Sequence, residues 1–97
     1  MLEVFFTNNA KNQLAKLKFD KGLAKRRNAV KKAIRLLAQN PKHPGLNTHE
    51  FTTLKGPNGE KVFVAYAEQS TPAAYRIFWH YGPGKEQITI LAITPHP

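Results

Sequence analysis

Residues 74–81 read AYRIFWHY, and the alternation in this stretch decides the arrangement of the fold. Successive side chains of a β-strand point to opposite faces of the sheet. One face then carries four large apolar or aromatic side chains, Tyr75, Ile77, Trp79 and Tyr81. The opposite face carries a cation, a ring and an imidazole, Arg76, Phe78 and His80. The first face suits covering by helices, so we expect the second face to be open.

The sequence on both sides of this strand continues in the same alternating pattern. Strands are expected at Glu50–Lys55, Lys61–Ala67 and Gln87–Ile93, in addition to 74–81. Residues 56–59 read GPNG and predict a turn, because proline presets its own φ and asparagine or glycine accepts a positive φ. The second half of the chain is therefore predicted to be a sheet with short connections.

The first half has helical periodicity after one short apolar strand at Leu2–Phe6. Thr7 is a suitable N-cap for a helix over Asn8–Leu17. A longer helix is predicted over Leu23–Gln39, because apolar residues recur there at the spacing of one buried stripe. Asn40 and Pro41 end that helix.

The element order predicts an α+β fold of the type β-α-α-β-β-β-β, with a helical hairpin packed on one face of a mainly antiparallel sheet. The 97 residues are expected to form one domain, 1–97. The chain has no cysteine and no apolar run of about twenty residues, which excludes disulfides and a membrane-spanning helix. We therefore expect a cytoplasmic protein without membrane association.

Charge is distributed unevenly along the chain, whose formal net charge is +9. Residues 1–48 hold eleven lysines and arginines and two acids, whereas residues 49–97 hold four of each sign. A one-sided excess of this kind creates a field that attracts anionic partners. Five basic residues of the longer helix lie away from its buried stripe and have no acid three or four positions away: Lys25, Arg26, Lys31, Lys32 and Arg35. We expect these five to bind nucleic acid.

The second face of 74–81 is where chemistry is expected. Arg76 suits a phosphate contact, Phe78 a stacked base and His80 proton transfer. The residues alone fit an ordinary exposed sheet face equally well.

The chain resembles the RelE/ParE superfamily of toxins from type II toxin–antitoxin modules, and the resemblance covers essentially its whole length. Arg76 lies in the most specific motif, an aromatic-Arg-aliphatic strand. The motifs in chain order are Asn40-Pro41 with Pro44-Gly45-Leu46, Leu54-Lys55-Gly56, Tyr75-Arg76-Ile77-Phe78-Trp79, and a closing strand that ends at His96-Pro97.

This resemblance implies a toxin that cleaves messenger RNA at the ribosome and is silenced by a cognate antitoxin protein. Cleavage in this family needs no metal or other cofactor, because the ribose 2′-hydroxyl attacks the neighbouring phosphate. The resemblance makes Arg76 the phosphate-binding arginine and His96 a proton-transfer group, with Lys55 adding positive charge at the same edge.

The family pattern is incomplete in this chain. Thr52 stands where some ribonuclease members have a histidine, and Pro97 stands where others have a tyrosine. Four histidines could compensate, His43, His49, His80 and His96, and His80 is on the same strand face as Arg76. Glu50 or His49 could act as the proton acceptor.

Two other functions remain open at this point. The incomplete acid–base set also fits a ParE-like inhibitor of DNA gyrase. The charge alone fits a basic module that binds nucleic acid or an acidic protein and catalyses nothing. A metal-dependent hydrolase is not expected, because the six acids are scattered along the sequence.

Overall fold

The computed structural model describes residues 1–96, which form two α-helices and five β-strands in the predicted order. Short 3-10 turns at Lys21–Leu23 and Pro44–Leu46 follow the first and second helix. The elements are β1 (Glu3–Phe6), α1 (Asn8–Phe19), α2 (Ala24–Gln39), β2 (His49–Lys55), β3 (Lys61–Tyr66), β4 (Tyr75–Tyr81) and β5 (Gln87–Pro95).

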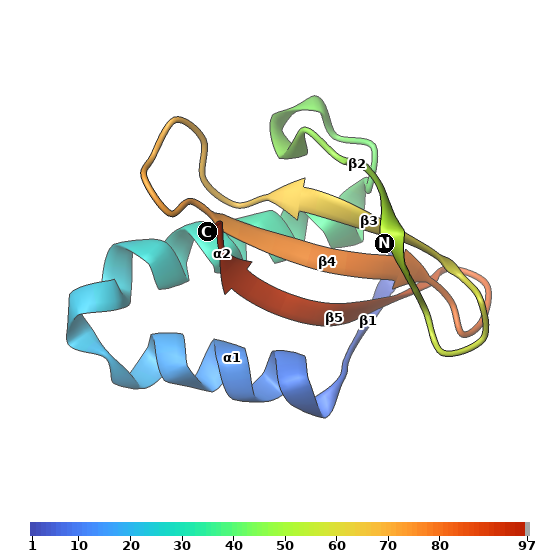
Figure 1. The fold of residues 1–97 in the computed structure, drawn as a ribbon, viewed down its shortest axis with the longest axis horizontal. Coiled ribbons are helices and arrows are strands. Elements are labelled where there is room, and N and C mark those ends of the chain that lie inside the picture. Colours follow the sequence, from blue (N-terminus) through green and yellow to red (C-terminus); the bar gives the residue numbers. More distant parts are fainter. Residues whose placement is uncertain (97) are drawn as a thin grey trace.

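One five-stranded sheet has the order β1-β5-β4-β3-β2. Neighbours pair antiparallel from β2 to β5, while β1 pairs parallel with β5. Figure 1 shows α1 and α2 side by side on one face of this sheet, which confirms the predicted α+β architecture. Neither helix within residues 1–96 has the length and apolar character needed to cross a bilayer.

The main core lies between the helices and the sheet. Leu17 of α1 and Val30 and Leu37 of α2 are buried against Ile77 and Trp79 of β4. The alternation of β4 therefore placed its apolar residues correctly. Thr7 is the N-cap of α1, as predicted, and its Oγ1 accepts a hydrogen bond from the backbone N–H of Ala10 at 3.1 Å.

The outer face of the sheet, away from the helices, is not open along its whole length. Val62, Val64 and Phe78 form a second, smaller core there. A register shift in β2 between Glu50 and Lys55 accompanies a contact of Phe51 with Phe78, whose ring centroids lie 5.0 Å apart, edge to face. The expectation of a fully exposed outer face was wrong, because an irregular edge strand covers its centre.

Candidate functional site

Arg76 lies on the outer face, as the alternation of β4 predicted. It pairs in register with Tyr66 of β3 and Thr94 of β5. Its guanidinium carbon lies 5.0 Å from the centre of the Phe78 ring, a distance typical of cation–π contacts. Within residues 1–96 it forms no ion pair, and its buried Nε has no hydrogen-bond partner. The Phe78 ring therefore packs against the Arg76 guanidinium, whose positive charge is not compensated by a carboxylate of the described residues.

Two proton-transfer groups lie on the same face next to Arg76. Tyr66 is directly opposite Arg76 across the β3–β4 ladder. His49 begins β2 opposite Val64, and its ring centroid is 5.8 Å from that of Tyr66. Sequence reasoning missed Tyr66, because only the pairing register of β3 with β4 shows that it adjoins Arg76. A phenol and an imidazole can both donate and accept protons.

His96 extends this group at the end of β5. Thr94 is paired with Arg76, and residues two positions apart on a strand share a face, so His96 belongs to the outer face. The backbone N–H of His96 donates to the carbonyl of Ala74 at 2.8 Å, which continues the ladder past Pro95. Tyr66 and His96 line one hollow of about 330 Å³ beside the β3–β4 loop. The final motif residue, Pro97, lies outside the described residues.

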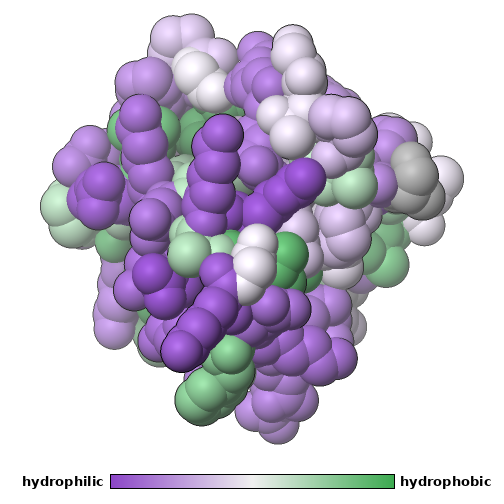
Figure 2. Space-filling view, turned by 90° about the vertical axis from the view of Figure 1, so that its left-hand side faces the viewer, coloured by the Kyte–Doolittle hydropathy of each residue, from purple (hydrophilic) through white to green (hydrophobic). Residues whose placement is uncertain are grey.

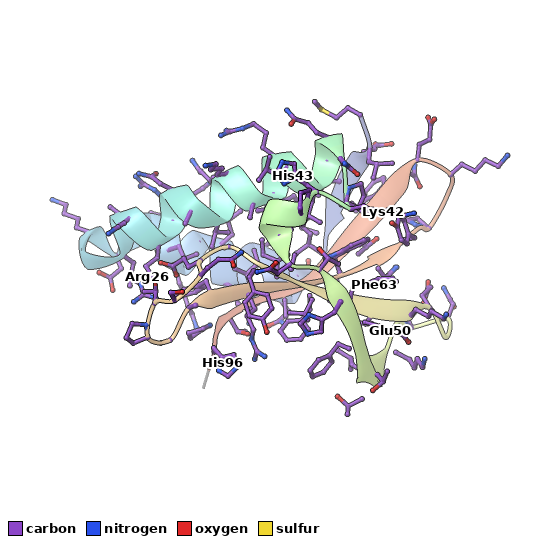
Figure 3. The ribbon with its side chains drawn as sticks, turned by 90° about the horizontal axis from the view of Figure 1, so that it is seen from above. Arg26, Lys42, His43, Glu50, Phe63 and His96 are labelled. Carbon is purple, nitrogen blue, oxygen red and sulfur yellow. The ribbon has the colours of Figure 1, made fainter. Side chains whose placement is uncertain are left out.

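Lys55 and Glu50 do not join this group. Lys55 pairs with Lys61, and five residue steps along β3 separate Lys61 from Tyr66, roughly 17 Å of strand. Glu50 is opposite Phe63, whose ring packs on the helix side against Trp79. Figure 3 shows Glu50 on β2 and His96 well apart from it, beside the β3–β4 loop. The expected contribution of both residues at the Arg76 edge was therefore wrong.

His80 and Phe78 are also placed differently from the expectation. His80 is 4% exposed and Phe78 is 7% exposed, so neither ring is open to a substrate. The Nδ1 of His80 lies 2.7 Å from the carbonyl oxygen of Tyr81 and 3.9 Å from Oε2 of Glu60. Hydrogen bonds from the backbone N–H groups of Glu60 and Asn58 lower the pKa of the Glu60 carboxyl. His80 thus belongs to a small structural cluster at the β2–β3 turn.

The basic face of α2 is smaller than the sequence indicated. Arg26 is taken up by the β3–β4 loop: it forms an ion pair with Glu68 at 3.1 Å and donates to the carbonyls of Ala73 and Pro72. The other four, Lys25, Lys31, Lys32 and Arg35, are exposed. Figure 2 faces the end of the molecule where α1 turns into α2 and shows a mostly hydrophilic surface.

A metal centre finds no support in the part of the chain that the structure describes, where no group of three or more histidine, cysteine, aspartate or glutamate side chains could hold an ion. The outer face brings together Arg76, Tyr66, His49 and His96.

No family model and no curated protein matches this chain. Solved structures do resemble it over nearly their whole length. The YoeB/ParE toxin from Agrobacterium tumefaciens matches with a TM-score of 0.72 at 11% identity, and the match covers 99% of this chain and 100% of the toxin chain. The YoeB dimer from Staphylococcus aureus has a TM-score of 0.68 at 11% identity, with 99% and 98% covered.

A third solved structure is the archaeal RelE–RelB complex from Pyrococcus horikoshii OT3, with a TM-score of 0.64 at 15% identity and 97% of this chain and 93% of that chain covered. Identities this low establish the architecture rather than the activity. The chain has the RelE/ParE toxin fold, with two helices packed on one face of a five-stranded mixed sheet.

Proposed function

We propose that this protein is the toxin of a type II toxin–antitoxin module and that it cleaves messenger RNA at the ribosome, in the cytoplasm. The observation that carries the proposal is Arg76, a cation without a carboxylate partner in residues 1–96, on the outer face beside three proton-transfer side chains. Those three are Tyr66, His49 and His96. The likeness to YoeB, ParE and RelE toxin structures supports the same reading.

The proposed reaction needs no metal. A base removes the proton of a ribose 2′-hydroxyl, and the 2′-oxygen attacks the adjacent phosphorus. The bond from phosphorus to the 5′-oxygen of the next nucleotide breaks, and an acid protonates that oxygen. The products are a 2′,3′-cyclic phosphate and a free 5′-hydroxyl, so the reaction consumes no other reagent.

Arg76 would bind the phosphate oxygens and stabilise the extra negative charge of the pentacoordinate intermediate. His96 would exchange a proton with one of the two reacting oxygens, since the unperturbed imidazole pKa of about 6.5 is close to neutral pH. Tyr66 lies opposite Arg76 and lines the same hollow as His96, so it is the best-placed second group. The four exposed cations of α2 would hold the RNA backbone or the ribosome.

Substitution of Arg76 tests this assignment. Arg76→Ala should lower mRNA cleavage by about 100-fold or more and abolish growth arrest, since loss of one donor to a developing anion has effects of this size. Arg35→Ala removes the same charge from α2 and is the matched control, with cleavage reduced only modestly. Primer-extension mapping of cellular mRNA after induction gives the readout. An Arg76→Ala protein that folds and stays fully toxic would refute the site.

The proposed partner is a cognate antitoxin with an acidic or amphipathic segment. The Pyrococcus horikoshii structure is a complex of RelE with RelB, and the exposed lysines of α2 offer this chain a complementary surface. The proposal predicts a short reading frame next to the gene, whose co-expression should suppress toxicity and yield a stable complex on gel filtration.

One observation favours a second function, inhibition of DNA gyrase. Lys55, Glu50 and His80 do not reach the Arg76 site, so the expected catalytic set is smaller than the sequence indicated. Under this alternative, purified protein inhibits gyrase supercoiling and leaves RNA intact. Under a third, non-catalytic alternative, it binds nucleic acid with steep salt dependence and inhibits neither process.

A further inference from the structure

A larger hollow, of about 540 Å³, lies at the start of β2 and is separate from the Arg76 site. The segment that follows α2 forms one wall, and the sheet forms the other. Figure 3 shows Lys42 and His43 on the first wall above Phe63 of β3. The lining residues are Pro41, Lys42, His43, Pro44, Asn47, Thr48, His49, Phe63, Trp79 and Tyr81.

The sheet wall of this hollow is aromatic. The Phe63 and Trp79 rings stack with centroids 5.0 Å apart, and the Tyr81 ring meets Trp79 edge to face at 4.9 Å. Tyr81 is 46% exposed although it is part of this cluster, and His49, which also lines the hollow, is exposed too. An exposed aromatic ring bordering a cavity is a usual means of binding an unpaired base by stacking, and Tyr81 supplies such a ring here.

The loop wall is basic. Lys42 is exposed, and none of the ten lining residues is acidic. The Nδ1 of His43 accepts a hydrogen bond from the backbone N–H of Gly45 at 3.0 Å, so a neutral His43 carries its proton on Nε2 and remains a donor. The wall therefore favours a ligand that brings negative charge.

Trp79 is the buried centre of the aromatic wall. Its indole is 1% exposed, and its Nε1 has no hydrogen-bond partner among residues 1–96.

We propose that this hollow binds one unpaired nucleotide, with its base against Tyr81 and its phosphate at Lys42. The volume lies within the range of small-ligand sites. His49 also contacts Tyr66 on the outer face, so it borders both sites. The nucleotide bound here is then one that flanks the cleaved bond, a reading that rests on the proposed function.

The chain provides its own probe, because Trp79 is its only tryptophan. Adenosine 5′-monophosphate should produce a saturable change in Trp79 fluorescence. A single-stranded tetranucleotide with 2′-O-methyl riboses should do the same at lower concentration, and it cannot be cleaved because the attacking hydroxyl is blocked.

Two variants test the binding mode with adenosine 5′-monophosphate. Lys42→Ala should weaken binding about tenfold through loss of the charged contact to phosphate. Tyr81→Leu keeps an apolar side chain, removes the stacking ring and should weaken binding about fivefold or more. Lys18→Ala is the matched control: it removes another exposed lysine, from α1, and should change affinity by less than about twofold.

The proposal would be overturned if saturating nucleotide left the fluorescence unchanged, or if Lys42→Ala and Lys18→Ala weakened binding equally. It would also be overturned if an acidic peptide gave the same Lys42-dependent response, because the hollow would then be a peptide site. Arg76→Ala separates the two proposals, because it should abolish RNA cleavage without changing the affinity for the mononucleotide. If the protein binds the nucleotide through Lys42 and Tyr81 but cleaves no RNA, nucleotide binding in the hollow is confirmed and the ribonuclease proposal fails.

Discussion

Thr7 joins the start of α1 to the last strand of the sheet. Its hydroxyl accepts a hydrogen bond from the N–H of Ala10 at 3.1 Å and donates one to the carbonyl of Leu91 at 2.9 Å. Thr7→Ala should lower the free energy of unfolding by about 1–2 kcal/mol, because the helix loses its cap and the partly buried Leu91 carbonyl keeps only the donor from Asn9 at 3.3 Å. Urea titration at 25 °C measures the change. Lys11→Ala, an exposed change in the same helix, should stay within about 0.5 kcal/mol.

Arg26 is a structural residue, although the sequence grouped it with the nucleic-acid-binding cations. Three of its contacts hold the β3–β4 loop: the carboxylate of Glu68 and the carbonyls of Ala73 and Pro72. The Glu68 side chain is 9% exposed and also accepts a hydrogen bond from the N–H of Tyr75, so removal of Arg26 leaves a nearly buried carboxylate short of a donor.

We expect Arg26→Ala to destabilise the fold by about 2 kcal/mol, since hydrogen bonds to charged groups contribute more than neutral ones. Lys25→Ala, next to it on α2 and exposed, is the control and should change stability little. Thermal unfolding of both variants measures the difference. Equal melting temperatures of Arg26→Ala and Lys25→Ala would show that the loop contacts of Arg26 add nothing measurable to stability.

At the scale of the elements, the strands and helices followed from local sequence because each has its own signal. The alternation in β4 placed Ile77 and Trp79 in the main core, and Thr7 marked the start of α1. No comparable local pattern predicted that β2 would cover the centre of the outer face. Phe51 reaches Phe78 across an irregular edge strand, and a register shift in one strand cannot be read from that strand alone.

The β2–β3 turn should loosen in acid because of Glu60. Hydrogen bonds from the backbone N–H groups of Glu60 and Asn58 favour the carboxylate and lower its pKa in the folded state. A lowered pKa contributes stability above the unfolded value of about 4.3, and that contribution is lost as the pH falls through the folded pKa. The melting temperatures of the wild type and Glu60→Gln should therefore converge between about pH 6 and about pH 3. A constant difference over that range would contradict the prediction.

At the scale of the whole molecule, the candidate site was only partly readable from sequence. The alternation of β4 indicated Arg76 and a family resemblance added His96, whereas Tyr66 and the position of Lys55 depend on which residues face each other across β3. The ion pair of Arg26 joins residues 42 positions apart, so the charge that remains free on α2 could not be counted before the loop was placed.

That free charge makes a quantitative prediction for RNA binding. Each cation that contacts a phosphate of single-stranded RNA contributes about 0.7 to the slope of log affinity against log salt. Arg35→Gln should therefore lower the slope by about 0.7, and the combined change of Lys31, Lys32 and Arg35 to glutamine by about 2. Arg26→Gln removes the same charge from the same helix but should leave the slope nearly unchanged, because Glu68 already neutralises Arg26. Filter binding from about 50 to about 300 mM salt measures these slopes below the melting temperature of each variant. Equal effects of Arg26→Gln and Arg35→Gln would mean that only the net charge of the protein matters, and that the exposed face of α2 is not the surface that RNA contacts.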